Sequence, residues 1–225
     1  LRDAAEFKLL VNFHGCTVPR GWSRTYPHLL SMEAVRGAEN YTFSREYPEK
    51  APWHNTILPF TRNVVGPMDY TPVAFTNGGN APRTTVGHEL ALSVVFESGL
   101  LHFADRTSAY RELPPAPQQW LKAIPVAWDE TRLLGGFPGQ WLVVARRQGA
   151  NWYLGGINGQ DQPQQVALDW QFLAEGNYTL RLIEDGARDR SFADRQLTVD
   201  RTQPLELRLP PRGGFVGELS PSAAP

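Results

Sequence analysis

A nearly continuous apolar run lies near the start of the chain: Phe7-Lys8-Leu9-Leu10-Val11-Asn12-Phe13, followed directly by His14-Gly15. Runs of this kind are typical of parallel strands that are buried on both faces. The pattern therefore predicts a strand over 7–13. Because α/β barrels place their active sites at the carboxyl ends of their strands, the polar residues that follow Phe13 are candidates for chemistry.

Two helices are predicted further along the same half of the chain. Between Thr84 and Ser98, apolar residues recur at helical spacing, and Thr84 and Thr85 offer N-caps. The segment 116–123 is typical of a second helix, in which Pro117 falls in the first turn, where proline is tolerated. Both helices are expected to pack against the predicted barrel.

The composition of the chain changes after Pro125-Val126-Ala127-Trp128-Asp129-Glu130, where Gly135-Gly136 and Pro138-Gly139 supply turn residues. We expect a domain boundary between 127 and 128. Beyond it, short β runs alternate with turns, as in an antiparallel sandwich. The runs cover 141–145, 152–157, 165–170, 178–183, 196–199 and 205–209. The last run alternates strictly, so one of its faces should be buried.

The overall composition excludes several classes of partner. The 22 basic and 23 acidic residues give a formal net charge of -1, so the chain lacks the basic surface that nucleic-acid or anionic-membrane binding requires. No run reaches the roughly 18 apolar residues of a membrane span. Cys16 is the only cysteine, which excludes an intramolecular disulfide and a cysteine-based zinc site. We expect an uncharged partner, and the oligomeric state is left open.

Polar residues are densest between His14 and Glu39. Glycoside hydrolysis needs one carboxylic acid to protonate the leaving oxygen and a second carboxylate as nucleophile or base, and Glu33 and Glu39 are candidates. Their six-residue spacing does not place them on one helical face, so a bent loop would have to bring them together. The alternative is that both are ordinary solvated glutamates. A hard cation such as calcium could also use these carboxylates, although no EF-hand spacing is present.

Two further polar residues have both a functional and a structural interpretation. His14 would contact a sugar or act in catalysis, or it would simply end a strand. Asp69 lies in Gly66-Pro67-Met68-Asp69-Tyr70-Thr71-Pro72, where an aspartate commonly bonds its own backbone in a turn. On the residues alone, the turn interpretation of Asp69 is favoured.

At these positions the sequence resembles glycoside hydrolase family 97, a family of α-glucosidases and α-galactosidases. The resemblance rests on several ordered motifs, which together are far more specific than one short pattern. The motifs are Val11-Asn12-Phe13-His14-Gly15-Cys16, Pro19-Arg20-Gly21-Trp22-Ser23-Arg24-Thr25-Tyr26-Pro27, Glu33-Ala34-Val35-Arg36-Gly37-Ala38-Glu39, Leu58-Pro59-Phe60-Thr61-Arg62, Gly66 to Pro72, and Trp128-Asp129-Glu130-Thr131. One departure is Arg20, where the inverting pattern of the family has Thr.

The resemblance implies a fold. The family combines an N-terminal β-sandwich, a (β/α)8 barrel and a C-terminal β-sandwich. We therefore expect an α/β plus all-β chain, with the C-terminal part of a (β/α)8 TIM-barrel over 1–127 and an antiparallel β-sandwich over 128–225. The first region has roughly half the length of a typical barrel, so we expect the rest of the barrel to lie outside this chain.

The resemblance also implies roles for individual residues. Glu39 matches the general acid, Glu33 matches a calcium ligand with Glu39 also close to the metal, and His14 matches a sugar-contacting histidine. Inverting members have Glu after this histidine, as base and metal ligand, whereas this sequence has Gly15. Because glycine cannot deprotonate water, the chain resembles the retaining branch, in which an Asp on an earlier barrel strand is the nucleophile.

The function expected from this resemblance is that of a retaining, Ca²⁺-dependent α-glycosidase. We expect α-galactosides rather than α-glucosides as substrates, because retaining members with this glycine include α-galactosidases. The alternative is that the chain is a non-catalytic fragment or carbohydrate-binding module without a complete pair of acid and nucleophile. Family members generally work in the periplasm or outside the cell, so a periplasmic or secreted location is expected.

Overall fold

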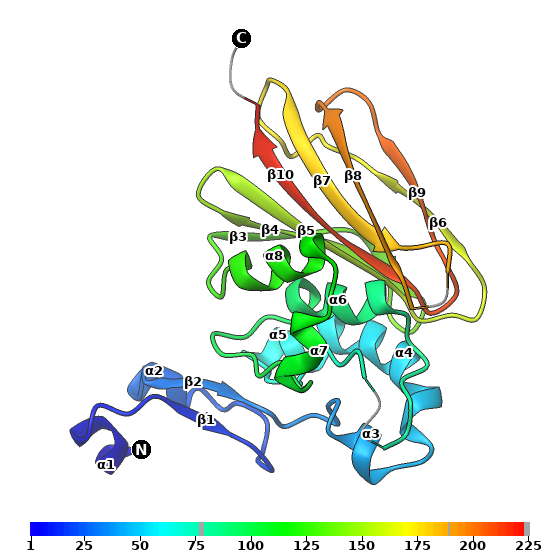
Figure 1. The fold of residues 1–225 in the computed structure, drawn as a ribbon. Helices are drawn as coiled ribbons and strands as arrows, with labels where there is room; N and C mark the ends of the chain where they lie inside the picture. Colours follow the sequence, from blue (N-terminus) through cyan, green and yellow to red (C-terminus); the bar gives the residue numbers. More distant parts are fainter. Residues whose placement is uncertain (77–78, 189, 223–225) are drawn as a thin grey trace.

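The computed structural model describes residues 1–76, 79–188 and 190–222, and its first half is mainly helical while its second half is mainly β (Figure 1). The helices are α1 (Arg2–Glu6), α2 (Trp22–Thr25), α3 (Asn40–Phe43), α4 (Tyr47–Ile57), the 3-10 helix η1 (Leu58–Phe60), α5 (Arg62–Val65), α6 (Val86–Val95), α7 (Thr107–Arg111) and α8 (Pro115–Ala123). The strands are β1 (Val11–Phe13), β2 (Leu29–Met32), β3 (Glu130–Phe137), β4 (Trp141–Gln148), β5 (Asn151–Asn158), β6 (Gln164–Leu168), β7 (Tyr178–Asp185), β8 (Phe192–Val199), β9 (Leu205–Leu209) and β10 (Gly214–Pro221).

Three short segments of the first half run side by side in the same direction. β1 pairs in parallel with β2, with Phe13 opposite Met32, and Met32 forms a parallel bridge to Met68. The residues that follow these three positions therefore emerge at one edge of the small sheet. Within the described part of the chain the parallel pairing extends no further, so the partial barrel stays a prediction.

The strand expected over 7–13 was wrong for its first four residues, since β1 begins only at Val11. Phe7 is 74% exposed rather than buried. Its backbone N–H donates to Asp3 O at 3.0 Å, and Lys8 then turns the chain with a positive φ of 55°. The turn that ends α1 thus uses a donor that a strand would need.

The second half forms an antiparallel β-sandwich, as predicted. One sheet has the strand order β3-β4-β5-β10-β7-β8, and β6 pairs with β9 as a second sheet. Alternate residues of β4 point to opposite sides: Val143 and Ala145 share a core with β6 and β9, whereas Leu142 and Val144 share a core with α6. Both faces of the large sheet are therefore covered, one by a small sheet and one by a helix (Figure 1).

The β runs read from the sequence correspond to β4 through β9, and the bounds of β9 are confirmed at both ends. Two strands were missed, β3 and β10. Gly135 and Gly136, which suggested a turn, lie inside β3, whereas Pro138 and Gly139 do form the turn that follows it. β10 starts with a glycine where it meets α6. A Cβ atom on Gly214 would lie 2.7 Å from the Cα of His88, so this close approach of strand and helix requires glycine.

The helix expected over 84–98 is confirmed as α6, which joins the two halves of the molecule. Every residue of α6 is buried. The Thr85 side chain caps the helix by accepting a hydrogen bond from the backbone N–H of His88. At the other end, the Arg146 guanidinium from β4 donates to Val94 O at 2.6 Å, which satisfies a carbonyl that a helix end leaves without a partner.

The helix expected over 116–123 is confirmed as α8. Trp120 of α8 donates its indole N–H to Ser93 Oγ at 3.0 Å and packs against the ring of Tyr153 in β5. The helical half and the large sheet thus share a core, and the boundary expected between 127 and 128 stays a prediction. The longest helix of the described residues, α4, has 11 residues, and none of these helices is long and apolar enough to cross a bilayer.

Glu89 is a carboxyl group buried in the middle of α6. Its side chain is 0% exposed, and it accepts hydrogen bonds from Thr84 Oγ1 at 2.5 Å, Tyr41 Oη at 3.4 Å and the backbone N–H of Ala74 at 3.2 Å. It forms no ion pair with the described residues. Burial outweighs these hydrogen bonds and raises the pKa of Glu89 to about 7.

This raised pKa makes the stability of the chain depend on pH. Between about pH 4.5 and 7 the folded state keeps a proton on Glu89 that the unfolded state has released, so the free energy of unfolding falls as pH rises, in total by on the order of 3 kcal/mol. Gln removes this loss, because its amide stays neutral and can donate to the hydroxyls of Thr84 and Tyr41. Urea unfolding across this pH range should show Glu89→Gln gaining stability over the unmodified chain. Glu206→Gln, on an exposed position of β9, is the control. If the free energy of unfolding depended on pH in the same way for Glu89→Gln and for the unmodified chain, the prediction would be contradicted.

Candidate active site

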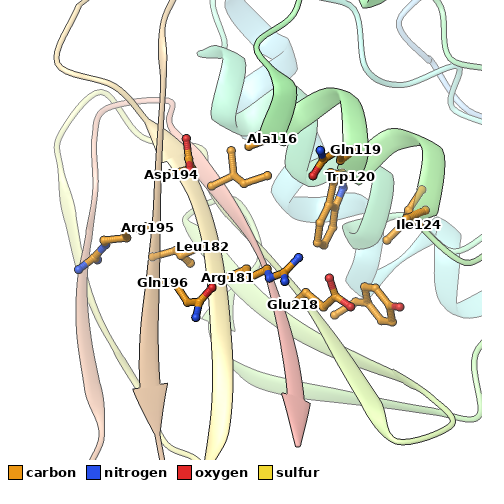
Figure 2. A pocket seen from close by; sticks show the side chains of 13 residues that line it. Ala116, Gln119, Trp120, Ile124, Arg181, Leu182, Asp194, Arg195, Gln196 and Glu218 are labelled. Carbon is orange, nitrogen blue, oxygen red and sulfur yellow. The ribbon is translucent and has the colours of Figure 1, made fainter. Parts of the chain in front are cut away.

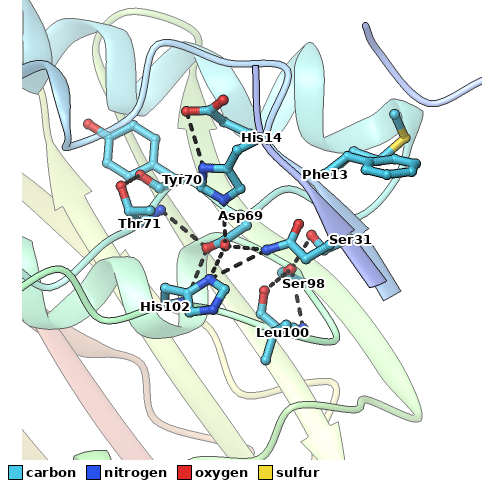
Figure 3. Close-up of polar contacts among 12 residues, drawn as sticks. Phe13, His14, Ser31, Asp69, Tyr70, Thr71, Ser98, Leu100 and His102 are labelled. Carbon is cyan, nitrogen blue, oxygen red and sulfur yellow. Dashed lines mark hydrogen bonds and ion pairs between the residues drawn. The ribbon is translucent and has the colours of Figure 1, made fainter. Parts of the chain in front are cut away.

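Three polar residues directly follow the three parallel segments of the first half. His14 follows β1, Glu33 follows β2, and Asp69 follows Met68. Since these segments run in the same direction, the three side chains meet at one edge of the small sheet. Figure 3 shows His14 and Asp69 at this edge. This edge is where α/β proteins bind their ligands.

Asp69 is the buried centre of the cluster, with a side chain that is 0% exposed. Its Oδ2 accepts hydrogen bonds from His14 Nε2 at 2.9 Å, His102 Nδ1 at 2.5 Å and Asn12 Nδ2 at 2.5 Å (Figure 3). Burial alone would raise its pKa, but these hydrogen bonds stabilise the carboxylate and hold the pKa of Asp69 below its usual value. The favoured turn interpretation explains only one bond, from the backbone N–H of Thr71 to Oδ1 at 3.3 Å.

His14 connects this buried carboxylate to two glutamates. Because its Nε2–H donates to Asp69, its Nδ1 faces the glutamates, 3.6 Å from Glu33 Oε1 and 3.8 Å from Glu39 Oε1. Partial burial disfavours the imidazolium, but the hydrogen bond to Asp69 and the surrounding carboxylates outweigh it and raise the pKa of His14 above its ordinary value. The ring is therefore held in one orientation within a negatively charged group.

The bent loop expected between Glu33 and Glu39 is present. Ala34 turns the chain with a positive φ of 39°, and the backbone N–H of Ala38 returns to Tyr70 O at 2.9 Å. The potential ligand atoms of the two glutamates and His14 all lie within 4.8 Å of one another. The structure thus brings the three residues of the family motif together, and their chemical roles stay predictions.

Gly15 takes part in the cluster through its backbone. It has a positive φ of 59°, and its N–H donates to Glu33 Oε2 at 2.7 Å. This bond fixes the Glu33 carboxylate with its other oxygen toward His14. The Glu39 carboxylate accepts no hydrogen bond from the described residues and is 49% exposed, so it is free to exchange a proton with a bound molecule.

Two members of the cluster were missed by the sequence reasoning, Asn12 and His102. Two features of the sequence could have identified them. Asn12 is a polar residue inside an apolar strand, and His102 interrupts the apolar run Leu100-Leu101-His102-Phe103. Sequence spacing could not link His102 to Asp69, because the two residues are 33 positions apart. They meet only in the folded chain, where the backbone N–H of His102 donates to Asp69 Oδ1 at 3.0 Å.

Two sets of side chains bring potential metal ligands together: His14 with Asp69 and His102, and His14 with Glu33 and Glu39. In the first set, Asp69 already accepts hydrogen bonds from both histidines. In the second, the carboxylates of Glu33 and Glu39 converge, and neither forms an ion pair with Lys or Arg of the described residues. Two such carboxylates fit a hard cation, which prefers oxygen ligands to the nitrogen of His14.

A separate hollow of about 430 Å³ lies between α8 and the large sheet (Figure 2). Trp120 points into it from α8, and Arg181, Gln196 and Glu218 line it from three adjacent strands (Figure 2). Glu218 and Arg181 lie opposite each other in the strand register. This hollow contains none of the clustered residues at the edge of the parallel segments, so we place the candidate active site at the His14 cluster.

Both halves of the chain match known proteins. Residues 127–220 match the family model "Glycosyl-hydrolase 97 C-terminal, oligomerisation", and residues 1–35 match the model "Glycoside hydrolase 97". The chain is 40% identical over 187 residues to a "Probable retaining alpha-galactosidase" of Streptomyces bingchenggensis, covering 83% of this chain and 28% of that protein. It is 33% identical over 225 residues to a "Retaining alpha-galactosidase" of Bacteroides thetaiotaomicron, covering 94% of this chain and 34% of the relative.

Solved structures share the fold of the whole chain. A β-arabinopyranosidase superposes with a TM-score of 0.89 at 32% identity, over 96% of this chain and 35% of that one. A glycoside hydrolase family 97 enzyme from Pseudoalteromonas sp. strain K8, solved in complex with acarbose, superposes with a TM-score of 0.84 at 28% identity, over 98% of this chain and 36% of that one. The chain spans about a third of the length of these relatives. Since two models of one family together match more than half of its residues and its fold is that of solved family members, the chain belongs to glycoside hydrolase family 97.

Proposed function

We propose that this chain carries the general acid/base of a retaining α-galactosidase. The observation that supports this most directly is the position of Glu39. Its partly exposed carboxylate lies within 4.8 Å of ligand atoms of Glu33 and His14, just beyond the ends of parallel strands. A carboxyl group so placed can protonate the oxygen of a leaving group and later take a proton from water.

The proposal assigns β1, β2 and the segment ending at Met68 to successive strands of a (β/α)8 TIM-barrel, followed by the C-terminal sandwich from 128 onward. The parallel direction of the three segments supports this assignment. So does the position of the polar residues, because barrel enzymes have their catalytic groups at the carboxyl ends of the strands. The nucleophile would come from a part of the relatives' length that this chain does not span.

Retention rather than inversion is supported by Gly15. Its position offers a backbone N–H to Glu33 but no carboxylate that could activate water directly. In a retaining mechanism, Glu39 first acts as acid and then as base, and a separate carboxylate about 5 to 5.5 Å away attacks the sugar. The curated relatives named retaining α-galactosidases support both the mechanism and the choice of galactosides over glucosides.

The test of this proposal follows the first product of hydrolysis by proton NMR. The enzyme that contains this chain is expected to release the α-anomer of galactose from a nitrophenyl α-galactoside, because two displacements restore the original configuration. The matched α-glucoside should be cleaved far more slowly. A β-anomer as first product would contradict retention, and faster cleavage of the glucoside would contradict the sugar assignment.

Calcium is proposed as the ion held by Glu33 and Glu39, because their carboxylates converge without a Lys or Arg partner among the described residues. A bound calcium ion would balance their charges and polarise a sugar oxygen. His14 would stay on Asp69 and orient the sugar beside the ion. The remaining ligands would come from the substrate, water or other parts of the enzyme, since calcium takes about six to eight oxygens.

Removing this ion should therefore lower activity. Exhaustive chelation of the complete enzyme is expected to reduce its turnover by about tenfold or more, and added Ca²⁺ should restore it. A chelator saturated with Ca²⁺ beforehand is the control for direct inhibition. Full activity in a sample shown by elemental analysis to hold no metal would remove calcium from the proposal.

Two properties of the complete protein are proposed on the family alone. A periplasmic or secreted location is expected from the resemblance to family members that work there. The model matched by residues 127–220 carries the description "oligomerisation", which supports self-association through the sandwich.

A further inference from the structure

A second hollow, of about 510 Å³, has Glu39 as one of its lining residues. Its lining residues come from α3 with the residue before it, from Thr76 and Asn80 on either side of residues 77–78, and from the turn at Asp105 and Arg106. The first follows β2 and the second follows the Met68 segment, so both leave the sheet at the edge where the candidate active site lies. Glu39 is thus shared between the His14 cluster and this hollow.

Phe43 presents an exposed aromatic ring on the same side as Glu39. Glu39 has helical backbone angles at the start of α3, and Phe43 is the last residue of that helix. Residues four apart on a helix share a face, and both of these side chains line the hollow. The Phe43 ring is 78% exposed and forms no ring contact with the described residues. Flat aromatic faces of this kind suit stacking on a sugar ring.

Arg106 also lines the hollow, and its guanidinium offers hydrogen-bond donors. Asp105 holds this part of the lining in place, because its carboxylate accepts from the backbone N–H groups of Phe75 at 2.7 Å, Thr76 at 2.6 Å and Arg106 at 2.8 Å. The Arg106 guanidinium itself forms no hydrogen bond or ion pair with the described residues. Its five N–H donors are therefore available to hydroxyl groups of a ligand.

We infer that this hollow is the leaving-group site, which takes an uncharged, hydroxylated ring such as a second sugar, stacked on Phe43 and hydrogen-bonded by Arg106. The inference rests on the proposed role of Glu39 as the acid. A general acid must lie at the glycosidic oxygen, between the sugar that is transferred and the group that leaves. His14 touches Glu39 but does not line the hollow, so the transferred sugar is assigned to the His14 cluster and the leaving group to the hollow.

The test compares two substrates of the complete enzyme that differ only in the leaving group. α-Galactosyl fluoride has no second ring and needs little protonation, whereas an α-1,6-linked galactosyl-glucose must place its glucose ring in the leaving-group site. Phe43→Ala is expected to lower kcat/KM for the disaccharide by about tenfold, the effect of one lost stacking contact, and to leave kcat/KM for the fluoride within about twofold. Arg106→Ala should show the same selectivity, and Phe43→Trp should keep the disaccharide activity.

Phe137→Ala is the matched control, because Phe137 is a similarly exposed ring, 62% exposed, on the distant strand β3. It should change neither substrate. Unchanged disaccharide cleavage by both Phe43→Ala and Arg106→Ala would overturn the assignment of the hollow, and so would an equal loss with both substrates. If the unmodified enzyme failed to cleave the fluoride at all, the proposed glycosidase function would fail first, and the leaving-group site with it.

Discussion

Glu39→Gln is expected to lower the cleavage of an unactivated α-galactoside by roughly 10²- to 10⁴-fold, the usual contribution of general acid–base assistance. Gln keeps the size of Glu and an oxygen for a metal ion but cannot transfer a proton. Aryl galactosides with good leaving groups should lose much less in the first step, because a stable leaving anion barely needs protonation. The kcat/KM values for the two kinds of substrate measure the difference, because kcat/KM reports the first step only.

The second half of the reaction offers an independent check on the same variant. Glu39 must also activate water to break down the covalent intermediate, so the intermediate should accumulate with activated substrates. Azide needs no base, and it should therefore raise the turnover of Glu39→Gln and yield an α-galactosyl azide. Glu46→Gln, which removes a surface glutamate paired with Lys50, should behave like the unmodified enzyme. A β-configured azide product, or equal losses with good and poor leaving groups, would argue against Glu39 as acid and base of a retaining enzyme.

The second large effect is expected at Asp69, which positions two histidines. Asp69→Asn replaces an acceptor-only carboxylate by an amide whose NH₂ must face a donor. If it takes the place of Oδ2 it faces His14 and His102, and if it takes the place of Oδ1 it faces the backbone N–H of Thr71. In the first orientation the His14 ring loses its acceptor. In the second the amide NH₂ opposes the backbone N–H groups of Thr71 and His102, so the side chain must shift and no longer holds the ring in place. We therefore expect kcat/KM to fall by about 10²-fold, as small misplacements of substrate-contacting groups do.

A buried donor left without an acceptor also costs stability, about 1 to 3 kcal/mol, so the kinetic loss needs a control of equal structural cost. Asp185 provides it. Its carboxylate accepts from Thr85 Oγ1, Gly87 N and Gly214 N at 2.6, 2.7 and 3.0 Å, far along the chain from the cluster. Asp185→Asn should lower the thermal unfolding temperature to a similar degree while kcat/KM stays close to that of the unmodified enzyme. A parallel loss of activity in both variants would reduce Asp69 to a purely structural role.

The local patterns of the sequence were sufficient wherever near neighbours in the chain decide the outcome. The helix α6 was predictable from apolar residues at helical spacing and from the cap at Thr85, because both act within one or two turns. The strand β9 was predictable from its strict alternation, since each side chain of a strand points to one of two faces. The motif that contains Glu33 and Glu39 pointed to a shared site although their spacing did not.

Other features were invisible to these patterns because they depend on what covers a segment. The run that begins at Phe7 has the composition of a buried strand, but its first residues finish a helix turn and stay exposed. The strand β10 lies at the centre of the large sheet although its glycines weaken any strand signal. Gly214 is tolerated there because α6 passes too close for a larger residue.

The sequence by itself determined the family of this chain, the antiparallel sandwich of its second half and the group of residues from which its chemistry must come. Only the tertiary structure decided that Asp69 is the buried centre of that group and that His102 and Asn12 belong to it. The reason is physical. A carboxylate can remain buried only if donors from elsewhere in the chain satisfy it, and those donors lie 33 and 57 residues away, beyond the reach of any helical or strand periodicity.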